Sequence, residues 1–278
     1  MLFLRDMDYR QVKDWQKLPE LKRLKDLKRQ PETLFYRGQW QAETFANCVA
    51  IVGSRRMTQY GRRVIEKMVP KLVFERKTIV SGFMYGVDQY AHRMAVENGG
   101  RTIAVLGWGI KQKLESADEA LARQIIKANG LLISEWEDQR ALLWTFPVRN
   151  RIVAALANEV IVVEAGVKSG SLITANLALQ LKRKLVAVPG PVTSRVSAGT
   201  NQLIADGLAA MWTGENERTE KSRNQEPLIV MLMNEALSAD EVARRVNQPV
   251  ANVGAQLSLL TIRGEIVEKD GKYYVPEI

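Results

Sequence analysis

The feature that most constrains the fold is a repeated alternation between short apolar runs and longer amphipathic segments, which extends from Val49 to Trp212. Such an alternation predicts βαβ units with right-handed crossovers, and therefore an α/β fold with a doubly wound parallel sheet covered on both faces. The predicted strands are Val49–Val52, Thr78–Val80, Thr102–Leu106, Leu131–Ile133, Val160–Val163, Leu185–Val188 and Ala209–Trp212. The predicted helices between them include Tyr60–Phe74, Asp88–Asn98, Ala117–Ala128 and Thr200–Ala205.

One of these strands is followed by a turn that suits anions. The β-branched run Glu159–Glu164 is typical of a strand buried on both faces of a parallel sheet. The loop Gly166–Ser171 is small and polar, and helical spacing resumes at Leu172, so we expect Ser171 to cap the new helix. The free N–H groups and the positive end of the helix dipole bind anions at such a turn, and Gly170 lets a phosphate approach the backbone.

Basic side chains and other small turns accompany this predicted anion site. Arg149, Arg151 and Lys168 are close to it in sequence, so we expect a phosphate-rich ligand. Other predicted strands also end in small residues, for example at Gly53 and Ser54. Because ligands of open α/β sheets bind at the carboxyl ends of the strands, these turns should line one crevice, where two helix N-termini converge on one phosphate.

The first strand and its turn, AIVGSRRMTQYGR, stand where a dinucleotide-binding fingerprint would be, but Gly-x-Gly-x-x-Gly is absent. No acid in a matching position is available for a ribose, which disfavours a nicotinamide or flavin enzyme. Gly53 and Ser54 instead offer backbone and hydroxyl donors at a helix start, with Arg55 and Arg56 beside them. We expect Arg56 to be a surface charge.

Two groups of side chains have both a functional and a structural interpretation. Asp88 and His92, the only histidine, are spaced i and i+4 on one helix face, which suits acid–base chemistry. Asp88 equally suits the cap of its helix and His92 a hydrogen-bond partner of its neighbour, and we favour this structural role because no Ser or Cys is spaced for a triad. Phe146, near Arg149 and Arg151, suits the stacking of unpaired bases or a place in the core.

The distribution of charge indicates the class of partner. The chain has 278 residues and a net charge of +9. Residues 46–225 carry 25 Lys and Arg against 16 Asp and Glu, whereas residues 226–278 carry 5 against 8. A basic middle part suits a polyanionic partner, or it is a solvated basic surface. The acidic tail is poorly suited to a phosphate backbone.

Composition also indicates the compartment. No apolar run approaches the roughly 20 residues of a membrane span. The first ten residues contain acids and lack an apolar core, so they do not resemble a signal peptide, and we expect a cytoplasmic protein. A single cysteine, Cys48, excludes an internal disulfide, and no spacing fits a zinc site.

Nine segments of the chain resemble, in their residues and in their order, motifs of the DNA-processing protein A (DprA, also called Smf) family. FPVRNRI and SGSLITA carry this resemblance most specifically, and it covers about residues 45–212. It implies an extended Rossmann domain that binds single-stranded DNA, forms a homodimer, protects incoming DNA and helps to load a RecA-type recombinase in natural transformation. With it we expect no catalytic residue, cofactor or metal. The segments are AIVGSRRMTQYGR, VSGFMYGVDQYAH, TIAVLG, LISE, FPVRNRIVAALA, VIVVEA, SGSLITANLAL, VAVPG and GTNQLIADG.

The resemblance also implies the position of the DNA pocket. The sequence departs from the family pattern at Phe83, Met84 and Trp136, which concerns the rim of that pocket. The residues implied to bind DNA are Gly53, Ser54, Arg55, Phe146, Arg149, Asn150, Arg151, Lys168, Ser169, Gly170 and Ser171.

Changes of composition predict the domain organisation. We expect an N-terminal helical arm over residues 1–45, a Rossmann-like DNA-binding domain over 46–213, a linker over 214–226 and a winged-helix domain over 227–278. The arm is too short for the whole sterile-alpha-motif-like domain with which many family members begin. In the last domain, Ser238 and Glu241 form a capping box, and the helix Val250–Ile262 has no Lys or Arg. A protein-docking or structural role is therefore favoured there over the reading of duplex DNA.

An alternative function comes from another class of protein. The lysine-decarboxylase-like nucleotide phosphoribohydrolases share this type of sheet and a Gly-rich phosphate turn. Their Pro-Gly-Gly-x-Gly-Thr type of loop, with its following glutamate, has only Lys168-Ser-Gly-Ser171 as a counterpart here, without the acid. A nucleotide-sensing module is a third interpretation.

Overall fold

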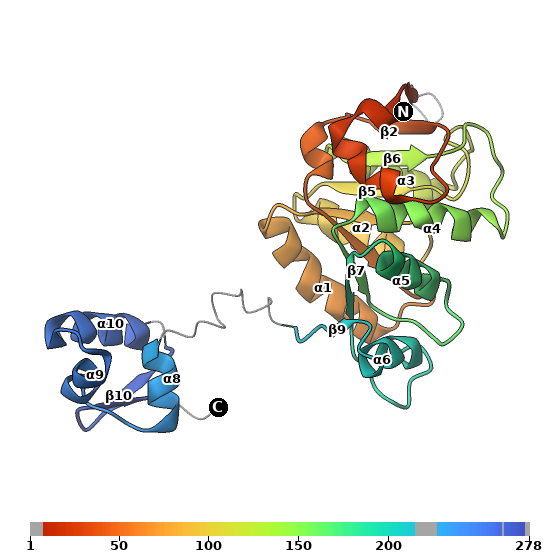
Figure 1. The fold of residues 1–278 in the computed structure, drawn as a ribbon. Coiled ribbons are helices and arrows are strands. Elements are labelled where there is room, and N and C mark those ends of the chain that lie inside the picture. Colours follow the sequence, from red (N-terminus) through yellow and green to blue (C-terminus); the bar gives the residue numbers. More distant parts are fainter. Residues whose placement is uncertain (1–7, 215–226, 263, 276–278) are drawn as a thin grey trace. The chain divides into compact units, whose positions relative to one another are not determined.

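A nine-stranded, mostly parallel sheet forms the centre of the larger part of the chain (Figure 1). Its strands lie in the order β1-β2-β6-β5-β4-β3-β7-β8-β9, and the pairs from β6 to β9 are all parallel. The predicted α/β class with a doubly wound parallel sheet is confirmed. The parallel strands are β3 (Cys48–Val52), β4 (Thr78–Ser81), β5 (Thr102–Val105), β6 (Leu131–Ser134), β7 (Glu159–Val162), β8 (Lys184–Ala187) and β9 (Ala210–Met211).

Helices cover both faces of the sheet because successive residues of a strand point to opposite sides. In β3, Val49 and Ile51 belong to the hydrophobic cluster under α1 and α2, whereas Ala50 and Val52 belong to the cluster under α4 and α5. Every residue of β3 is buried, as expected for a central parallel strand. The helices of the two layers are α1 (Gln59–Phe74), α2 (Val87–Glu97) and α3 (Ser116–Lys127) on one face, and α4 (Thr145–Leu156), α5 (Gly170–Gln180) and α6 (Ala198–Ala205) on the other.

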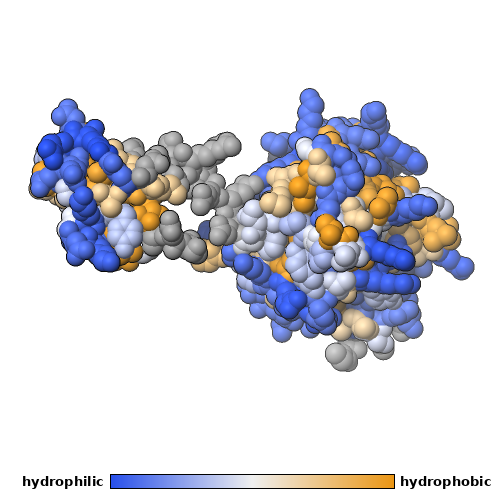
Figure 2. Space-filling model, turned by 90° about the horizontal axis from the view of Figure 1, so that it is seen from below, coloured by the Kyte–Doolittle hydropathy of each residue, from blue (hydrophilic) through white to orange (hydrophobic). Residues whose placement is uncertain are grey.

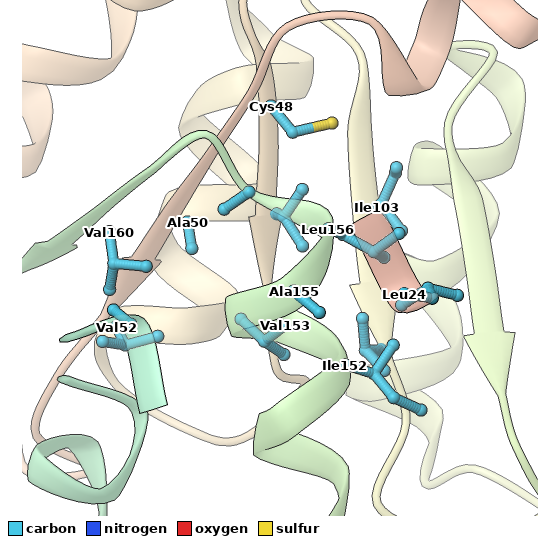
Figure 3. Packing of buried hydrophobic residues seen from close by; sticks show 14 of the residues in the cluster. Leu24, Cys48, Ala50, Val52, Ile103, Ile152, Val153, Ala155, Leu156 and Val160 are labelled. Atoms are coloured by element: carbon cyan, nitrogen blue, oxygen red, sulfur yellow. The ribbon is translucent and has the colours of Figure 1, made fainter. Parts of the chain in front are cut away.

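Helix α4 has an apolar half and a polar half. Its residues Ile152–Leu156 are all buried, and all of them except Ala154 belong to the hydrophobic cluster shared with the strands (Figure 3). Burial of a Leu or Ile side chain contributes roughly 1.5–3 kcal/mol, so this half fixes the helix on the sheet. In the first half, Thr145 and Arg149 donate to the carbonyls of Gly107 and Val105 at the carboxyl end of β5. The Phe-Pro-x-Arg-Asn-Arg segment is therefore held rigidly at that edge.

The N-terminal segment contributes strands that the sequence analysis did not predict. β1 (Arg10–Val12) pairs antiparallel with β2 (Leu34–Gly38), and β2 pairs antiparallel with β6. The helical pattern expected between Leu18 and Leu27 forms a 3₁₀ helix, η3 (Pro19–Asp26). Two shorter 3₁₀ helices are η2 (Trp15–Lys17) and η4 (Ala42–Phe45). Residues 10–45 are thus part of the layered unit, whereas a helical arm was expected.

Arg23 ties this segment to the sheet. Its guanidinium donates hydrogen bonds to the carbonyl oxygens of Phe45, Ala46 and Leu156 at 2.8–3.0 Å, and to Asn158 Oδ1 at 2.9 Å. These acceptors come from the approaches to β3 and β7. One side chain therefore holds η3 against both central strands.

The C-terminal residues form a second compact unit. The structure describes residues 8–214, 227–262 and 264–275 as a computed structural model, and the chain divides into Met1–Gly214 and Glu215–Ile278. Apart from Gly214, the predicted linker lies outside the described residues, and the predicted domain boundaries stay predictions. The elements of the second unit are α8 (Pro227–Asn234), α9 (Ala239–Val246), α10 (Val250–Ile262), β10 (Val267–Lys269) and β11 (Lys272–Tyr274).

The second unit has its own hydrophobic core, which includes Val242, Val253 and Leu257. The predicted capping box is present, because the Ser238 side chain accepts from the Glu241 backbone N–H while the Glu241 carboxylate accepts from the Ser238 N–H. Strands β10 and β11 pair antiparallel. The unit thus consists of three helices followed by a hairpin, and its assignment as a winged helix stays a prediction.

On the face shown in Figure 2, hydrophilic residues predominate and small groups of hydrophobic ones lie between them. Single exposed apolar residues are ordinary on folded domains. Within the described ranges, no helix has the length and apolar character needed to cross a membrane.

Candidate functional site

A pocket of about 340 Å³ lies beyond the carboxyl ends of β3 and β7. These two strands are neighbours at the point where the strand order reverses, because β4 and β5 follow on one side of β3 while β8 and β9 follow on the other side of β7. Open α/β sheets bind ligands at this switch point. The sequence predicted a crevice at this edge, and the pocket lies there.

The pocket brings together nine of the eleven residues that the sequence implied. They come from the turn after β3, the first two turns of α4 and the start of α5. The nine are Gly53, Ser54, Arg55, Phe146, Arg149, Asn150, Ser169, Gly170 and Ser171.

Arg151 and Lys168 are not among the lining residues. Both terminal nitrogens of Arg151 donate to the Glu135 carboxylate at 2.6 Å, and its Nε donates to the Arg29 carbonyl at 2.9 Å. This bidentate pair is almost fully buried and connects α4 to the end of β6 and to the N-terminal segment. Lys168 is exposed in the loop before α5.

The start of α5 faces the pocket. Ser169, and not Ser171 as predicted, is its N-cap, and the Ser169 hydroxyl accepts from the Ser171 N–H at 3.4 Å. The apolar spacing begins only at Leu172, but the helical backbone begins at Gly170, which explains the error of the prediction. No heavy atom of the described chain would lie within 4 Å of a Cβ added at Gly170. The space in front of this helix start is therefore open.

The start of α1, in contrast, is already occupied. The Glu164 carboxylate accepts hydrogen bonds from the Thr58 N–H at 3.0 Å and from the Thr58 hydroxyl. Glu164 is buried, and a Cβ at Gly61 would lie only 2.6 Å from its Cδ. The expectation that two helix N-termini converge on one phosphate is therefore wrong, because an internal carboxylate fills one of them.

Arg149 and Asp88 form the floor of the pocket. Arg149 is 2% exposed, and it donates to the Val105 carbonyl while its Nε has no partner among the described residues. Burial lowers the pKa of Arg149 to about 10, the Asp88 carboxylate opposing this shift, so the guanidinium stays charged at neutral pH. Burial raises the pKa of Asp88, and the charge of Arg149 opposes that shift. Both side chains fit only because Gly82 has no Cβ, which would collide with them.

His92 and Asp88 do not act as the pair that the i, i+4 spacing suggested. α2 begins at Val87 with Gly86 as its N-cap, so Asp88 is not the cap that the sequence suggested. The His92 ring nitrogens lie 2.6 Å from the Gly82 carbonyl and 2.6 Å from the Thr102 hydroxyl. Burial lowers the pKa of His92 to about 4. His92 is therefore a neutral, structural side chain.

Phe146 is a partly exposed wall of the pocket. The Arg55 guanidinium carbon lies 5.1 Å from the centre of its ring, and the Trp108 ring meets it edge-on at 6.3 Å. A Cβ at Gly107 would lie 2.7 Å from Phe146 Cδ1, so the ring rests on this backbone. Phe146 is thus a half-buried ring that lines the pocket, with Arg55 over it and Gly107 and Trp108 beside it.

Several important residues were not singled out from the sequence. Glu164 was only the end of the predicted strand Glu159–Glu164, Gly82 was only one of the small residues after a predicted strand, and Trp108 carried no motif. Their roles depend on contacts between distant segments, such as Glu164 with Thr58, which no local pattern contains. Among the described residues, no group of three His, Cys, Asp or Glu side chains could hold a metal ion.

Fold and site together define an extended Rossmann-type α/β protein. Its switch-point pocket combines an open helix start, a buried arginine and an aromatic wall. Residues 9–223 match the family model described as DNA recombination-mediator protein A, and the chain belongs to this family. It is thus a member of a family of DNA recombination mediators.

Named relatives agree with this assignment. The DNA processing protein DprA of Streptococcus pneumoniae is 38% identical over 191 residues, which cover 68% of this chain and 67% of that protein. Protein Smf of Escherichia coli is 34% identical over 268 residues, which cover 87% of this chain and 71% of that protein. The motifs that suggested the family were therefore interpreted correctly.

Two solved structures resemble the fold closely. The crystal structure of DprA from Streptococcus pneumoniae has a TM-score of 0.65 and 35% identity, with 76% of this chain and 72% of that chain covered. A structure of DNA processing protein A from Helicobacter pylori has a TM-score of 0.66 and 30% identity, with 74% of this chain and 92% of that chain covered. The latter describes the single-stranded DNA binding mode of that protein.

Proposed function

We propose that this chain binds single-stranded DNA in the switch-point pocket. As a homodimer, it would protect incoming DNA and help to load a RecA-type recombinase in natural transformation. The observation that carries the proposal is the open space in front of Gly170, which the start of α5 shares with Arg149, Arg55 and Phe146. Membership of a recombination-mediator family and the single-strand binding of the Helicobacter pylori relative support it.

The pocket offers different groups to the two parts of a nucleotide. A phosphate fits at the start of α5, where the helix dipole, the Gly170 backbone and the Ser169 and Ser171 hydroxyls can meet it. A base can stack on the exposed part of the Phe146 ring and on the Arg55 guanidinium beside it, because aromatic rings stack on any unpaired base. In a duplex, the faces of the bases are covered by their neighbours, so this wall favours a single strand.

A second candidate is a nucleotide-hydrolysing enzyme or sensor related to the phosphoribohydrolases. The observation that favours it is the Asp88 carboxylate on the floor of the pocket, whose pKa is raised by burial. Asp88 could take the place of the acid that the loop after β7 lacks. Hydrolysis of AMP, measured on the same preparation as DNA binding, distinguishes the two. Release of adenine without single-strand binding would favour the enzyme.

The DNA proposal is tested by Gly170→Asp, with fluorescence anisotropy of matched single-stranded and duplex oligonucleotides. The wild-type protein should prefer the single strand. The variant adds bulk and a negative charge where the phosphate approaches, and it should lose at least 1.5–3 kcal/mol of binding, the range for hydrogen bonds to charged groups. Because a Cβ at this position would meet no heavy atom within 4 Å, the fold should persist.

Gly254→Asp is a matched control. Gly254 lies in α10 of the second unit, and a Cβ there would also meet no heavy atom within 4 Å. Its substitution should leave the affinity unchanged. Equal affinity of the wild type for single strand and duplex would contradict the proposal.

A further inference from the structure

Three consecutive apolar side chains are exposed at the mouth of the pocket. Leu142, Leu143 and Trp144 are 46%, 89% and 52% exposed, and Leu143 also lines the pocket. Scattered apolar residues on a surface need no explanation, but a contiguous group beside a candidate site indicates a binding surface.

This turn is held firmly in its exposed position. Thr145 is fully buried, and its hydroxyl lies 2.5 Å from the Gly107 carbonyl and accepts from the Leu142 N–H at 3.2 Å. The Thr145 N–H donates in turn to the Leu142 carbonyl at 3.0 Å. The turn is thus anchored to the end of β5, and its apolar side chains stay exposed.

Trp144 is supported like Phe146. Its ring meets the ring of Trp136 edge-on, with centroids 6.0 Å apart and planes at 87°. The Ser134 hydroxyl accepts from the Trp136 N–H at 3.0 Å and donates to the Trp108 carbonyl at 2.6 Å. Since Trp108 contacts Phe146, the backing of the two rings is connected. A ring held at its edge and exposed over half its surface is suited to stacking.

We propose that Trp144, with Leu143 beside it, stacks the base next to the nucleotide held in the pocket. This inference rests on the proposed function and extends its site to at least two consecutive nucleotides of a single strand. Leu143 belongs both to the lining of the pocket and to the exposed apolar turn, so a strand can pass from the pocket to Trp144 without a break. Stacking tolerates any base, so the second position adds affinity and no sequence preference.

The charges around the turn favour a polyanion over a protein partner of positive charge. Arg140 is exposed just before it. The acids on the preceding segment are already engaged. Glu135 pairs with Arg151 at 2.6 Å, Lys111 and Tyr9 contact Glu137 at 2.8 Å and 2.6 Å, and Gln112 donates to Asp138 at 2.5 Å. The acidic side chains therefore have partners within the protein, while Arg140 remains available to a phosphate.

The test uses Trp144→Ala in the full chain and labelled oligothymidylates from one to ten nucleotides, measured by fluorescence anisotropy and, for the shortest, by competition. In the wild type, affinity should increase when the second nucleotide is added. The variant should lose this increase and bind long strands about 5- to 100-fold more weakly, as expected from stacking of one base. Binding of thymidine monophosphate should be unchanged.

Two further variants make the result specific. Trp144→Phe keeps an aromatic face and should retain most of the affinity. Phe74→Ala removes an aromatic side chain that is 89% exposed at the far end of α1, and it should have no effect. Circular dichroism of each variant shows whether it is folded.

The outcomes separate the inference from the function on which it rests. Full retention of long-strand affinity by folded Trp144→Ala overturns the inference and leaves the pocket proposal intact. Failure of the wild type to bind any single strand overturns both. A change of sedimentation by Trp144→Ala, without a change of DNA affinity, would identify the turn as a protein interface and overturn the inference.

Discussion

At the scale of single residues, His92 shows how burial fixes the state of a titratable group. Both of its ring nitrogens have partners at 2.6 Å, the Gly82 carbonyl and the Thr102 hydroxyl. A carbonyl can only accept, so Nε2 carries a proton. The Thr102 hydroxyl lies between Nδ1 and the Ile79 carbonyl, to which it also donates at 2.7 Å, so the neutral state of the ring follows from its burial.

The stability of the fold should consequently depend on pH through His92. Burial lowers its pKa from 6.5 to about 4, so between these values the unfolded chain binds a proton that the folded chain does not. The contribution of His92 to the free energy of unfolding is therefore fully present above pH 6.5 and is lost as the pH falls towards 4. The free energy of unfolding falls by about 3 kcal/mol over this range. Denaturant unfolding from pH 7.5 to 4.5 measures this, and His92→Gln should show a shallower decline. An identical pH dependence in both proteins would refute the assignment.

The motif Phe-Pro-x-Arg-Asn-Arg shows what a sequence can and cannot establish at this scale. It correctly placed a basic helix start beside the loop at Gly170. It did not distinguish Arg149 from Arg151, which are two positions apart on α4 and so point to opposite sides of the helix. Which side faces the pocket depends on how α4 packs on the sheet. Arg149 faces it, and Arg151 pairs with Glu135.

At the scale of elements, the start of α1 depends on a carboxylate from another strand. Glu164 follows β7 and accepts both the N–H and the hydroxyl of Thr58. Thr58 is the N-cap of α1, and its side chain also accepts from the Gly61 N–H at 3.2 Å. The end of β7 therefore determines where α1 begins.

Glu164→Ala should lower the free energy of unfolding by about 3 kcal/mol, because two hydrogen bonds to a charged acceptor are lost in a buried place. Chemical denaturation at pH 7 measures the change. Glu159→Ala, at the other end of the same strand, removes a partly exposed pair with Lys184 and should cost less than about 1 kcal/mol. Similar costs for both variants would show that Glu164 does not fix α1.

The central strands were predictable because they are buried on both faces and consist of continuous apolar runs, as in CVAIV of β3. β2 was not, although it has five residues as well. Only Leu34 and Arg37 of its residues are buried, which is not the alternation typical of a strand, and it closely follows Pro31. Its pairing partner β6 comes much later in the chain. A short strand that depends on so distant a partner leaves little signal in its own sequence.

At the scale of the whole molecule, the basic charge is concentrated in the larger unit. Residues 46–225 have an excess of basic side chains and residues 226–278 an excess of acidic ones. The helix α10 has no Lys or Arg, and Leu259 and Ile262 on it are exposed. The alternation of predicted strands and helices and the distribution of charged residues predicted two parts of opposite net charge from the sequence. The boundaries between the two parts stay predictions.

Affinity for single-stranded DNA should therefore fall with salt to nearly the same extent with and without residues 226–278. For single strands, the logarithm of the binding constant falls by about 0.7 per unit of the logarithm of the salt concentration for each phosphate that the protein neutralises. The acidic tail should neutralise none. Anisotropy titrations between 50 and 200 mM salt, approximately the range over which this effect is large, measure the slope. A clear decrease of the slope after truncation would show that the tail contacts the phosphates.

The buried carboxylate at α1 also bears on competition between ligands. In Rossmann-type sheets, the turn before this helix is where the pyrophosphate of a dinucleotide binds. Here the Glu164 carboxylate already takes the Thr58 N–H and repels a second anion. The first turn is thereby closed to the pyrophosphate of a dinucleotide, and the adjoining pocket keeps its open helix start for the single strand that we propose it binds.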